Sequence, residues 1–141
     1  MATNMKENGF ETMIVKYLVE NNHYEEGSNS DYNKIYAIDE VRLFRFLHDT
    51  QYEKLAELRI EDNEIEKKKF LDRLSKKISD DGVINIIRKG MKYKNKTVDF
   101  YMVRPSEGNQ EAKESYDKNI FSVTRQLRYS NDYGRLALVF F

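Results

Sequence analysis

Apolar and polar positions at the end of the chain predict two strands joined by a polar turn. Residues 120–129 mix apolar and polar side chains, whereas residues 136–141, LALVFF, form an unbroken apolar run. Asn131, Asp132 and Gly134 separate them and are typical turn residues. A continuous apolar run favours a strand covered on both faces, as in sheets packed between helices. Because such a strand usually continues into a partner strand, we expect this sequence to be the front part of a larger protein.

The beginning of the chain has the spacing of a helix. Apolar residues recur every three or four positions between residues 9 and 20, and Asn8 with Glu11 has the offset of a capping box. Residues 21–39 mix turn residues with tyrosines, which predicts an ordered loop that docks its aromatic side chains. The apolar stripe of the first helix consists of Phe10, Met13, Ile14, Tyr17 and Leu18.

Three further helices are predicted between residues 39 and 79. Asp39 can cap a short helix, and Thr50 with Glu53 forms a capping box that opens a second. Asn63 with Glu66 repeats the signature before a long charged helix. The apolar positions of the three are Val41, Phe44 and Leu47, then Tyr52, Leu55 and Leu58, then Phe70, Leu71, Leu74 and Ile78.

The segment before the final strands is more mixed. Residues 83–89 are apolar, but their period does not decide between helix and strand, and Gly90 ends them. Alternation over residues 97–103 predicts a strand that Pro105 stops, and residues 106–118 are polar and helix-prone. Helices first and a sheet last predict a mixed α/β domain in which helices flank a sheet.

Composition and charge limit the class of protein. A length of 141 residues fits one domain. The 24 basic and 24 acidic residues cancel, so any contact with nucleic acid must come from a local cluster. The lack of cysteine excludes disulfides, cysteine-bound zinc and thiol nucleophiles. The sequence shows no signal-peptide layout and no membrane-spanning apolar run, which predicts a cytoplasmic protein without membrane contact.

One local cluster lies on the first strand of the terminal pair. Arg125, Gln126, Arg128 and Tyr129 bring together two cations, an amide and an aromatic ring. Cations contact phosphates and aromatic rings stack on bases, so the cluster predicts a DNA contact. A strand edge with solvated arginines explains the same residues equally well.

Other polar residues give weaker signals. His23 and His48 lack the spacing of metal ligands and are interpreted as surface or loop histidines. The run from Lys67 to Lys69 is interleaved with acids and is most simply the solvated face of its helix. The sequence contains no glycine-rich phosphate loop, nucleophile elbow or serine–histidine–aspartate set. Spacing alone therefore identifies no complete active site.

Four stretches, taken in order, resemble the N-terminal region of type I restriction endonuclease R subunits (HsdR). The first is YEEGSNSDYNKIYAID, which resembles the family's aromatic, glycine and tyrosine-aspartate segment. The second is FLHDTQYEKLAEL, and the third is DGVINIIRKG followed by VRP. The fourth, YDKNIFSVTRQLRYSN, resembles the pattern that leads into the nuclease strand. The likeness spans about residues 9–141.

The resemblance implies that residues 1–141 are the N-terminal part of a restriction-endonuclease-like (PD-(D/E)XK) α/β domain, with helices packed on a mixed sheet. In the family, this domain precedes an ATP-dependent motor that pulls DNA and works with methyltransferase and specificity subunits. Its nuclease motif holds Mg²⁺, which takes oxygen ligands and activates water. The resemblance makes Glu11 a candidate metal-site acid, although a capping box explains Glu11 more simply.

Two departures from the family pattern stand out. The family has an Asp on the strand that resembles LALVFF; the best register puts Ala137 there, and no acid lies between Gly134 and Phe141. The family's Glu-x-Lys strand would come after Phe141. We therefore expect no nuclease activity from this polypeptide alone, with no complete metal site and no bound Mg²⁺ or ATP. Alternatives are a non-catalytic DNA-binding or subunit-docking module on this scaffold, or a purely structural interaction domain.

Overall fold

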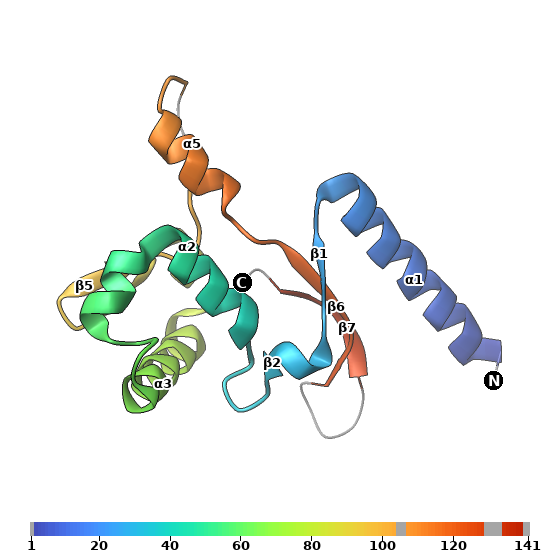
Figure 1. Ribbon diagram of the computed structural model, residues 1–141. Helices are drawn as coiled ribbons and strands as arrows, with labels where there is room; N and C mark the ends of the chain where they lie inside the picture. The colour runs from blue at the N-terminus through green and yellow to red at the C-terminus, as the bar shows by residue number, and fades with distance from the viewer. Residues whose placement is uncertain (1, 104–106, 129–133, 140–141) are drawn as a thin grey trace. The chain divides into compact units, whose positions relative to one another are not determined.

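The computed structural model (Figure 1) describes residues 2–103, 107–128 and 134–139, with side chains over residues 9–103 and 107–125. The chain divides into two compact units. Residues 1–41 and 120–141 form the terminal unit, which joins both ends of the chain, and residues 42–119 form the central unit. The mixed α/β class expected from the sequence is confirmed.

A three-stranded mixed sheet organises the terminal unit. Its order is β1 (Glu25–Gly27), β6 (Ser122–Arg128), β7 (Gly134–Val139), with β1 parallel and β7 antiparallel to β6. The strand pair expected near the end of the chain is thus confirmed, and β1 extends it. Val123 and Thr124 are both buried. Because successive side chains of a strand point to opposite faces, this part of β6 is covered on both.

Helix α1 (Ala2–Asn22) lies beside this sheet and contacts β1 and β6 (Figure 1). The capping box expected from Asn8 and Glu11 is wrong, because both residues lie well inside the helix. The predicted apolar stripe is not the buried side either. Phe10 is 60% exposed, whereas Glu11 and Val15, one turn apart, are buried.

The segment after α1 is ordered, as the sequence predicts. It holds β1, a short 3-10 helix η1 (Asn29–Asp31) and an antiparallel pair, β2 (Tyr32–Asn33) with β3 (Ile38–Asp39). The ring of Tyr24 packs on Phe121 at the start of β6, with ring centroids 5.8 Å apart. One of the predicted aromatic side chains therefore does dock on the unit.

Helix α2 (Glu40–Leu58) covers both of the helices that are predicted on either side of Thr50. Gln51 has non-helical angles, φ −143° and ψ 41°, so the two predicted helices meet at a kink. The hydroxyl of Thr50 donates to the carbonyl of Phe46 at 2.7 Å, four residues back. The Thr50 side chain thus bonds within the preceding turn, a pattern that often accompanies helix bending.

Helix α3 (Glu64–Asp81) begins where the capping signal predicts. The Asn63 side chain accepts hydrogen bonds from the N–H groups of Ile65 at 3.0 Å and Glu66 at 3.3 Å. The ambiguous apolar segment that follows is a helix, α4 (Val83–Lys89). The start of α3 could therefore be predicted from the local sequence, because it depends on the capping side chain of Asn63.

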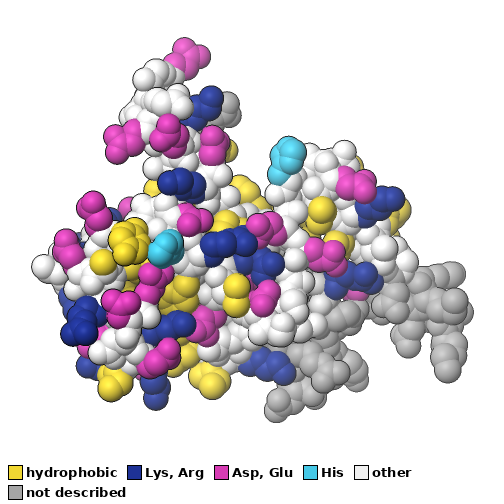
Figure 2. Space-filling view, viewed as in Figure 1, with side chains coloured by type: hydrophobic (Ala, Val, Ile, Leu, Met, Phe, Trp, Pro, Cys, Tyr) yellow, Lys and Arg dark blue, Asp and Glu magenta, His cyan; other side chains and the backbone are white. Residues whose placement is uncertain are grey.

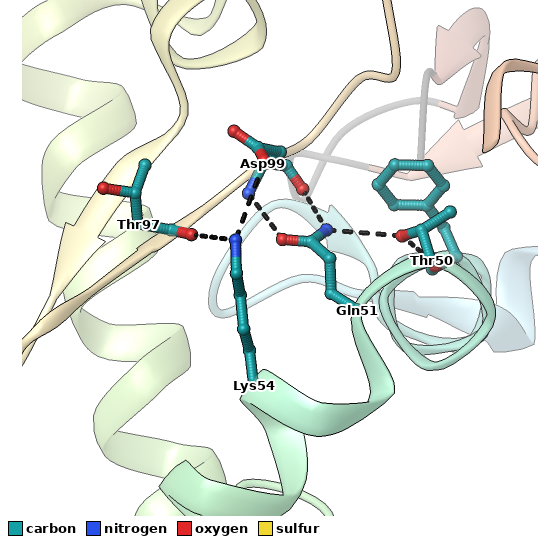
Figure 3. A network of polar contacts seen from close by, with 6 residues as sticks. Thr50, Gln51, Lys54, Thr97 and Asp99 are labelled. Carbon is teal, nitrogen blue, oxygen red and sulfur yellow. Dashed lines mark hydrogen bonds and ion pairs between the residues drawn. The ribbon is translucent and has the colours of Figure 1, made fainter. Parts of the chain in front are cut away.

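The predicted strand over residues 97–103 is shorter than expected. β4 (Met91–Tyr93) pairs antiparallel with β5 (Lys96–Val98), which ends the ladder at Val98. Beyond it, Gln51 donates to the carbonyl of Asp99 at 2.7 Å and accepts from its N–H at 2.8 Å (Figure 3). A side-chain amide thus takes the place of a neighbouring strand.

A second amide repeats this arrangement. Asn119 donates to the carbonyl of Met102 at 2.8 Å and accepts from its N–H at 2.8 Å. Asn119 follows α5 (Gln110–Asp117), the helix predicted from the polar segment. Two amides therefore satisfy main-chain groups of a segment that has left the sheet.

Phe70 of α3 is the centre of the core of the central unit. It is fully buried, and its ring lies 5.3 Å from Tyr93, 6.2 Å from Phe44 and 6.5 Å from Phe100, between centroids. These partners come from α2, β4 and the segment after β5, so one ring joins four parts of the unit. Within the described parts of the chain, no helix has both the length and the apolar character needed to cross a membrane.

Candidate functional site

The strand pair β6–β7 contains a bulge at the predicted DNA-contacting cluster. Thr124 stands opposite Ala137, but Leu127 stands opposite Arg135, so the pairing shifts by one residue between them. Arg125 and Gln126 are therefore set against a single residue of β7. Bulges of this kind bend a strand and redirect its side chains, and they are common beside functional sites.

The cluster itself is only partly described. The half-buried Arg125 lies on β6, and its carbonyl accepts a hydrogen bond from the Asn29 side chain at 3.3 Å. Gln126 and Arg128 belong to the same strand, whereas Tyr129 lies outside the described residues. The sequence analysis placed the four residues on one strand and did not predict the bulge within it.

Ala137 is in the middle of β7, directly opposite Thr124. Thr124 is 2% exposed, so the β6 member of this pair is in the interior of the terminal unit. The methyl side chain of an alanine offers no oxygen to a cation at this register. No acid occurs elsewhere on β7 either.

Glu11 is the predicted metal-site acid on α1. It is 5% exposed and takes part in an interaction within the chain. Burying a carboxylate is costly unless it is paired, so a partner is expected for this group. The described residues contain no group of three or more histidine, aspartate or glutamate side chains that could hold a metal. The described residues therefore do not fit the Mg²⁺ site that the resemblance implies.

Both histidines are exposed, as predicted. His23 follows α1 with φ of 58°. His48 on α2 places Nδ1 3.0 Å from a carboxylate oxygen of Glu61, and its ring meets Tyr52 edge-on at 5.0 Å. The hydrogen bond to Glu61, and then the charge of Glu61, raise the pKa of His48. This pair joins α2 to the turn that follows it.

The lysines at the start of α3 do not all behave as predicted. The ammonium of Lys67 lies 4.7 Å from the centroid of the Phe44 ring, a cation–π contact, so Lys67 is not simply solvated. Lys68 is exposed, and Lys69 lies 3.7 Å from Glu66. Glu66 also accepts from Lys94 at 2.7 Å; this hydrogen bond lowers the pKa of Glu66 and raises that of Lys94.

A groove in the central unit was not predicted from the sequence. It has a volume of about 790 Å³ and lies where the second half of α3, α4 and the β4–β5 hairpin meet. Its charged lining residues are Arg73, Lys77, Asp80, Asp81, Lys89 and Lys92. These residues are scattered over twenty positions, so only folding brings them together.

Outside such local clusters, charge is mixed. The face in Figure 2 shows acidic and basic side chains interspersed, in keeping with the formal net charge of zero.

Comparisons of the chain with protein-family models, with curated proteins and with solved structures found no match.

Proposed function

We propose that this chain is a nuclease-scaffold domain related to the N-terminal part of type I restriction R subunits, with DNA as its partner. The parent protein would cleave DNA with Mg²⁺ and ATP beside methyltransferase and specificity subunits. The chain by itself has no hydrolytic activity, because position 137 carries no carboxylate. The four sequence stretches that resemble the family motivate this assignment.

The observation that carries the proposal is the arrangement of α1, β6 and β7. An opening helix with a buried acid, Glu11, contacts β6, and β6 pairs antiparallel with the strand that holds Ala137. A helix followed by a mixed sheet is compatible with a PD-(D/E)XK nuclease core. The bulge at Arg125 and Gln126 supports a specialised role for β6, since bulges redirect side chains.

A non-catalytic DNA-binding or docking module is the second candidate. The specific observation in its favour is the register of Ala137 opposite Thr124, a pair without any ionisable group. Divalent cations such as Mg²⁺ require oxygen ligands, usually carboxylates. A scaffold that lacks one of these ligands keeps its shape and its DNA contacts while its chemistry is lost.

Restoring the acid tests the nuclease assignment. We expect Ala137→Asp to gain a response to Mn²⁺ or Mg²⁺, because a metal that binds only the folded chain stabilises it, by about 1.4 kcal/mol at ten times Kd. Differential scanning fluorimetry with a metal titration measures this as a rise in Tm. Ala137→Asn is the matched control, since it has the same shape without the charge, and it should not respond.

The outcomes test the nuclease scaffold that both candidates assume. An Ala137→Asp protein that responds to metal no better than Ala137→Asn contradicts the nuclease scaffold. A response that disappears when Glu11→Gln is added assigns Glu11 as a second ligand. As an activity readout, the Ala137→Asp chain joined to a Glu-x-Lys strand of the family should nick supercoiled plasmid with Mg²⁺, whereas the unaltered chain should not.

A further inference from the structure

The groove of the central unit has an unbalanced charge. The ammonium of Lys77 and the carboxylate of Asp81 lie 2.7 Å apart and largely neutralise one another. Among the described residues, Arg73, Lys89 and Lys92 have no ion-pair partner. Three cations therefore face one remaining acid, Asp80, in a chain whose formal net charge is zero.

We propose that this groove binds the phosphodiester backbone of a nucleic acid. The three unpaired cations come from three different elements, α3 for Arg73, the end of α4 for Lys89 and β4 for Lys92. Several cations around one groove suit a chain of phosphates, because affinity for a nucleic acid rises with the number of phosphates that are neutralised. The groove would contribute affinity for the nucleic acid through charge, and this affinity would not depend on the base sequence.

The uncharged residues that line the groove also favour the phosphodiester backbone of a nucleic acid as the ligand. None of the described side chains that line the groove is aromatic, so the groove offers no platform on which a base could stack. Its volume of about 790 Å³ also exceeds what one small anion would fill. Contacts to phosphate position a protein on nucleic acid without reading its sequence, which is the role that this lining allows.

The wall of the groove is held by a close main-chain approach at Gly90. Its φ is 71°, and a Cβ added there would lie 2.6 Å from the carbonyl of Val98 on β5. Ile86 of α4 is 1% exposed and anchors that helix, and the Asn85 side chain donates to the carbonyl of Asp81 at 2.7 Å. These contacts fix Lys89 and Lys92 on either side of the Gly90 turn.

This site is independent of the proposed function. It uses none of the residues in β6, β7 or α1, and it lies in the other unit of the chain. Failure of the Ala137→Asp metal test would leave the groove proposal standing. A groove variant that binds DNA with the original slope would likewise leave the nuclease assignment to its own experiment, whereas a chain that binds no duplex at all would also count against DNA as its partner.

The test is DNA binding by the full chain across a salt series. Fluorescence anisotropy with a labelled duplex of about 20 base pairs compares the unaltered chain with Arg73→Gln/Lys89→Gln/Lys92→Gln. We expect the slope of log K against log salt to become shallower by about 3, roughly 0.9 for each phosphate that is no longer neutralised. The matched control, Lys34→Gln/Lys68→Gln/Lys113→Gln, removes the same charge from exposed lysines outside the groove and should keep the original slope.

The single variants Arg73→Gln and Lys89→Gln serve if the triple variant does not fold, and each should reduce the slope by about 1. The proposal is overturned if the groove variants keep the original slope, or if the control triple changes the slope as much as the groove triple. It is also overturned if the unaltered chain does not bind duplex DNA. Direct binding of inorganic triphosphate by a chain that does not bind duplex DNA would assign the groove to a small anion instead.

Discussion

Glu11 has two incompatible explanations, one from the local sequence and one from the family resemblance. As a partner of Asn8 it would sit at the start of a helix, and as a metal-site acid it would face the interior of the domain. The helix begins at Ala2, so the first explanation fails, and the 5% exposure of Glu11 agrees with an interior position. The three-residue offset between Asn8 and Glu11 could not show which explanation holds, because residues three apart also lie side by side in the interior of a helix.

The titration of His48 is a prediction at the scale of single residues. Glu61 raises the pKa of His48 above its ordinary value of about 6.5. Because the folded state holds the proton more tightly, the pair stabilises the fold fully below about pH 6.5, and this contribution is lost as the pH rises through the folded pKa. NMR titration of His48 should show the raised pKa.

The control for His48 is a second glutamate in the same unit. Glu61→Gln should lower the pKa of His48 and remove the pH-dependent contribution. Glu57→Gln removes a charge of the same kind, but Glu57 pairs with Lys96, so the pKa of His48 should stay raised. Equal behaviour of the two variants would show that the Glu61 contact does not form in solution.

At the scale of elements, the kink of α2 places the Gln51 side chain against the segment that follows β5. A straight helix would carry Gln51 through regular angles, whereas its φ of −143° accompanies a side chain that meets Asp99 (Figure 3). Lys54, one turn later, donates to the carbonyl of Thr97 at 2.7 Å and lies 3.8 Å from the Asp99 carboxylate. The second half of α2 thus holds the end of the β4–β5 hairpin.

Removing this amide should destabilise the central unit. Gln51→Ala removes two hydrogen bonds to the main chain of Asp99; each contributes about 0.5–1.5 kcal/mol, which together gives about 1–3 kcal/mol. Urea unfolding followed by circular dichroism should report a decrease in that range. The matched control is Gln110→Ala, since Gln110 is an exposed helical glutamine whose hydrogen bond to Glu114 is long, 3.5 Å.

For Gln110→Ala, the expected change is within about 0.5 kcal/mol, as for most surface substitutions. A Gln51→Ala protein as stable as the Gln110→Ala protein would contradict the role given to the Gln51 amide.

The bulge in β6 is also a feature of elements. Strand period alone predicts that Thr124, Gln126 and Arg128 share one face of the sheet. The register instead shifts by one residue between Thr124 and Leu127. A bulge depends on how two strands pair, so a sequence read one strand at a time does not disclose it.

At the scale of the whole molecule, the interior of the central unit depends on Phe70. Phe70→Ala should cost about 3–5 kcal/mol, because it removes a large buried side chain that packs against three other rings. This is a large share of the roughly 5–15 kcal/mol that stabilises a typical domain. Urea unfolding monitored by circular dichroism measures the decrease.

The comparison variant for Phe70 is Ile65→Ala on the same helix. Ile65 is 66% exposed, so its truncation should change stability by less than about 0.5 kcal/mol. Similar decreases for the two variants would show that the ring cluster is not the stabilising centre of the unit.

Local chemistry in the sequence determined several elements of this protein. The Asn63 cap, the long charged helix with Phe70 on its buried side, the two terminal strands and the break near Thr50 all follow from periods and turn residues. These signals act between residues that are close in sequence, where hydrogen bonds and side-chain spacing are set by the backbone itself.

Only the tertiary structure decided which surfaces meet. Glu11 is buried, whereas Phe10 is exposed. β5 ends at Val98, and the Gln51 side chain bonds to the main chain of Asp99 that follows. Arg73, Lys89 and Lys92 come together around one groove. Each of these outcomes joins residues that are distant along the chain or selects one of two apolar faces. Packing and hydrogen-bond satisfaction make that choice, and neither has a local period.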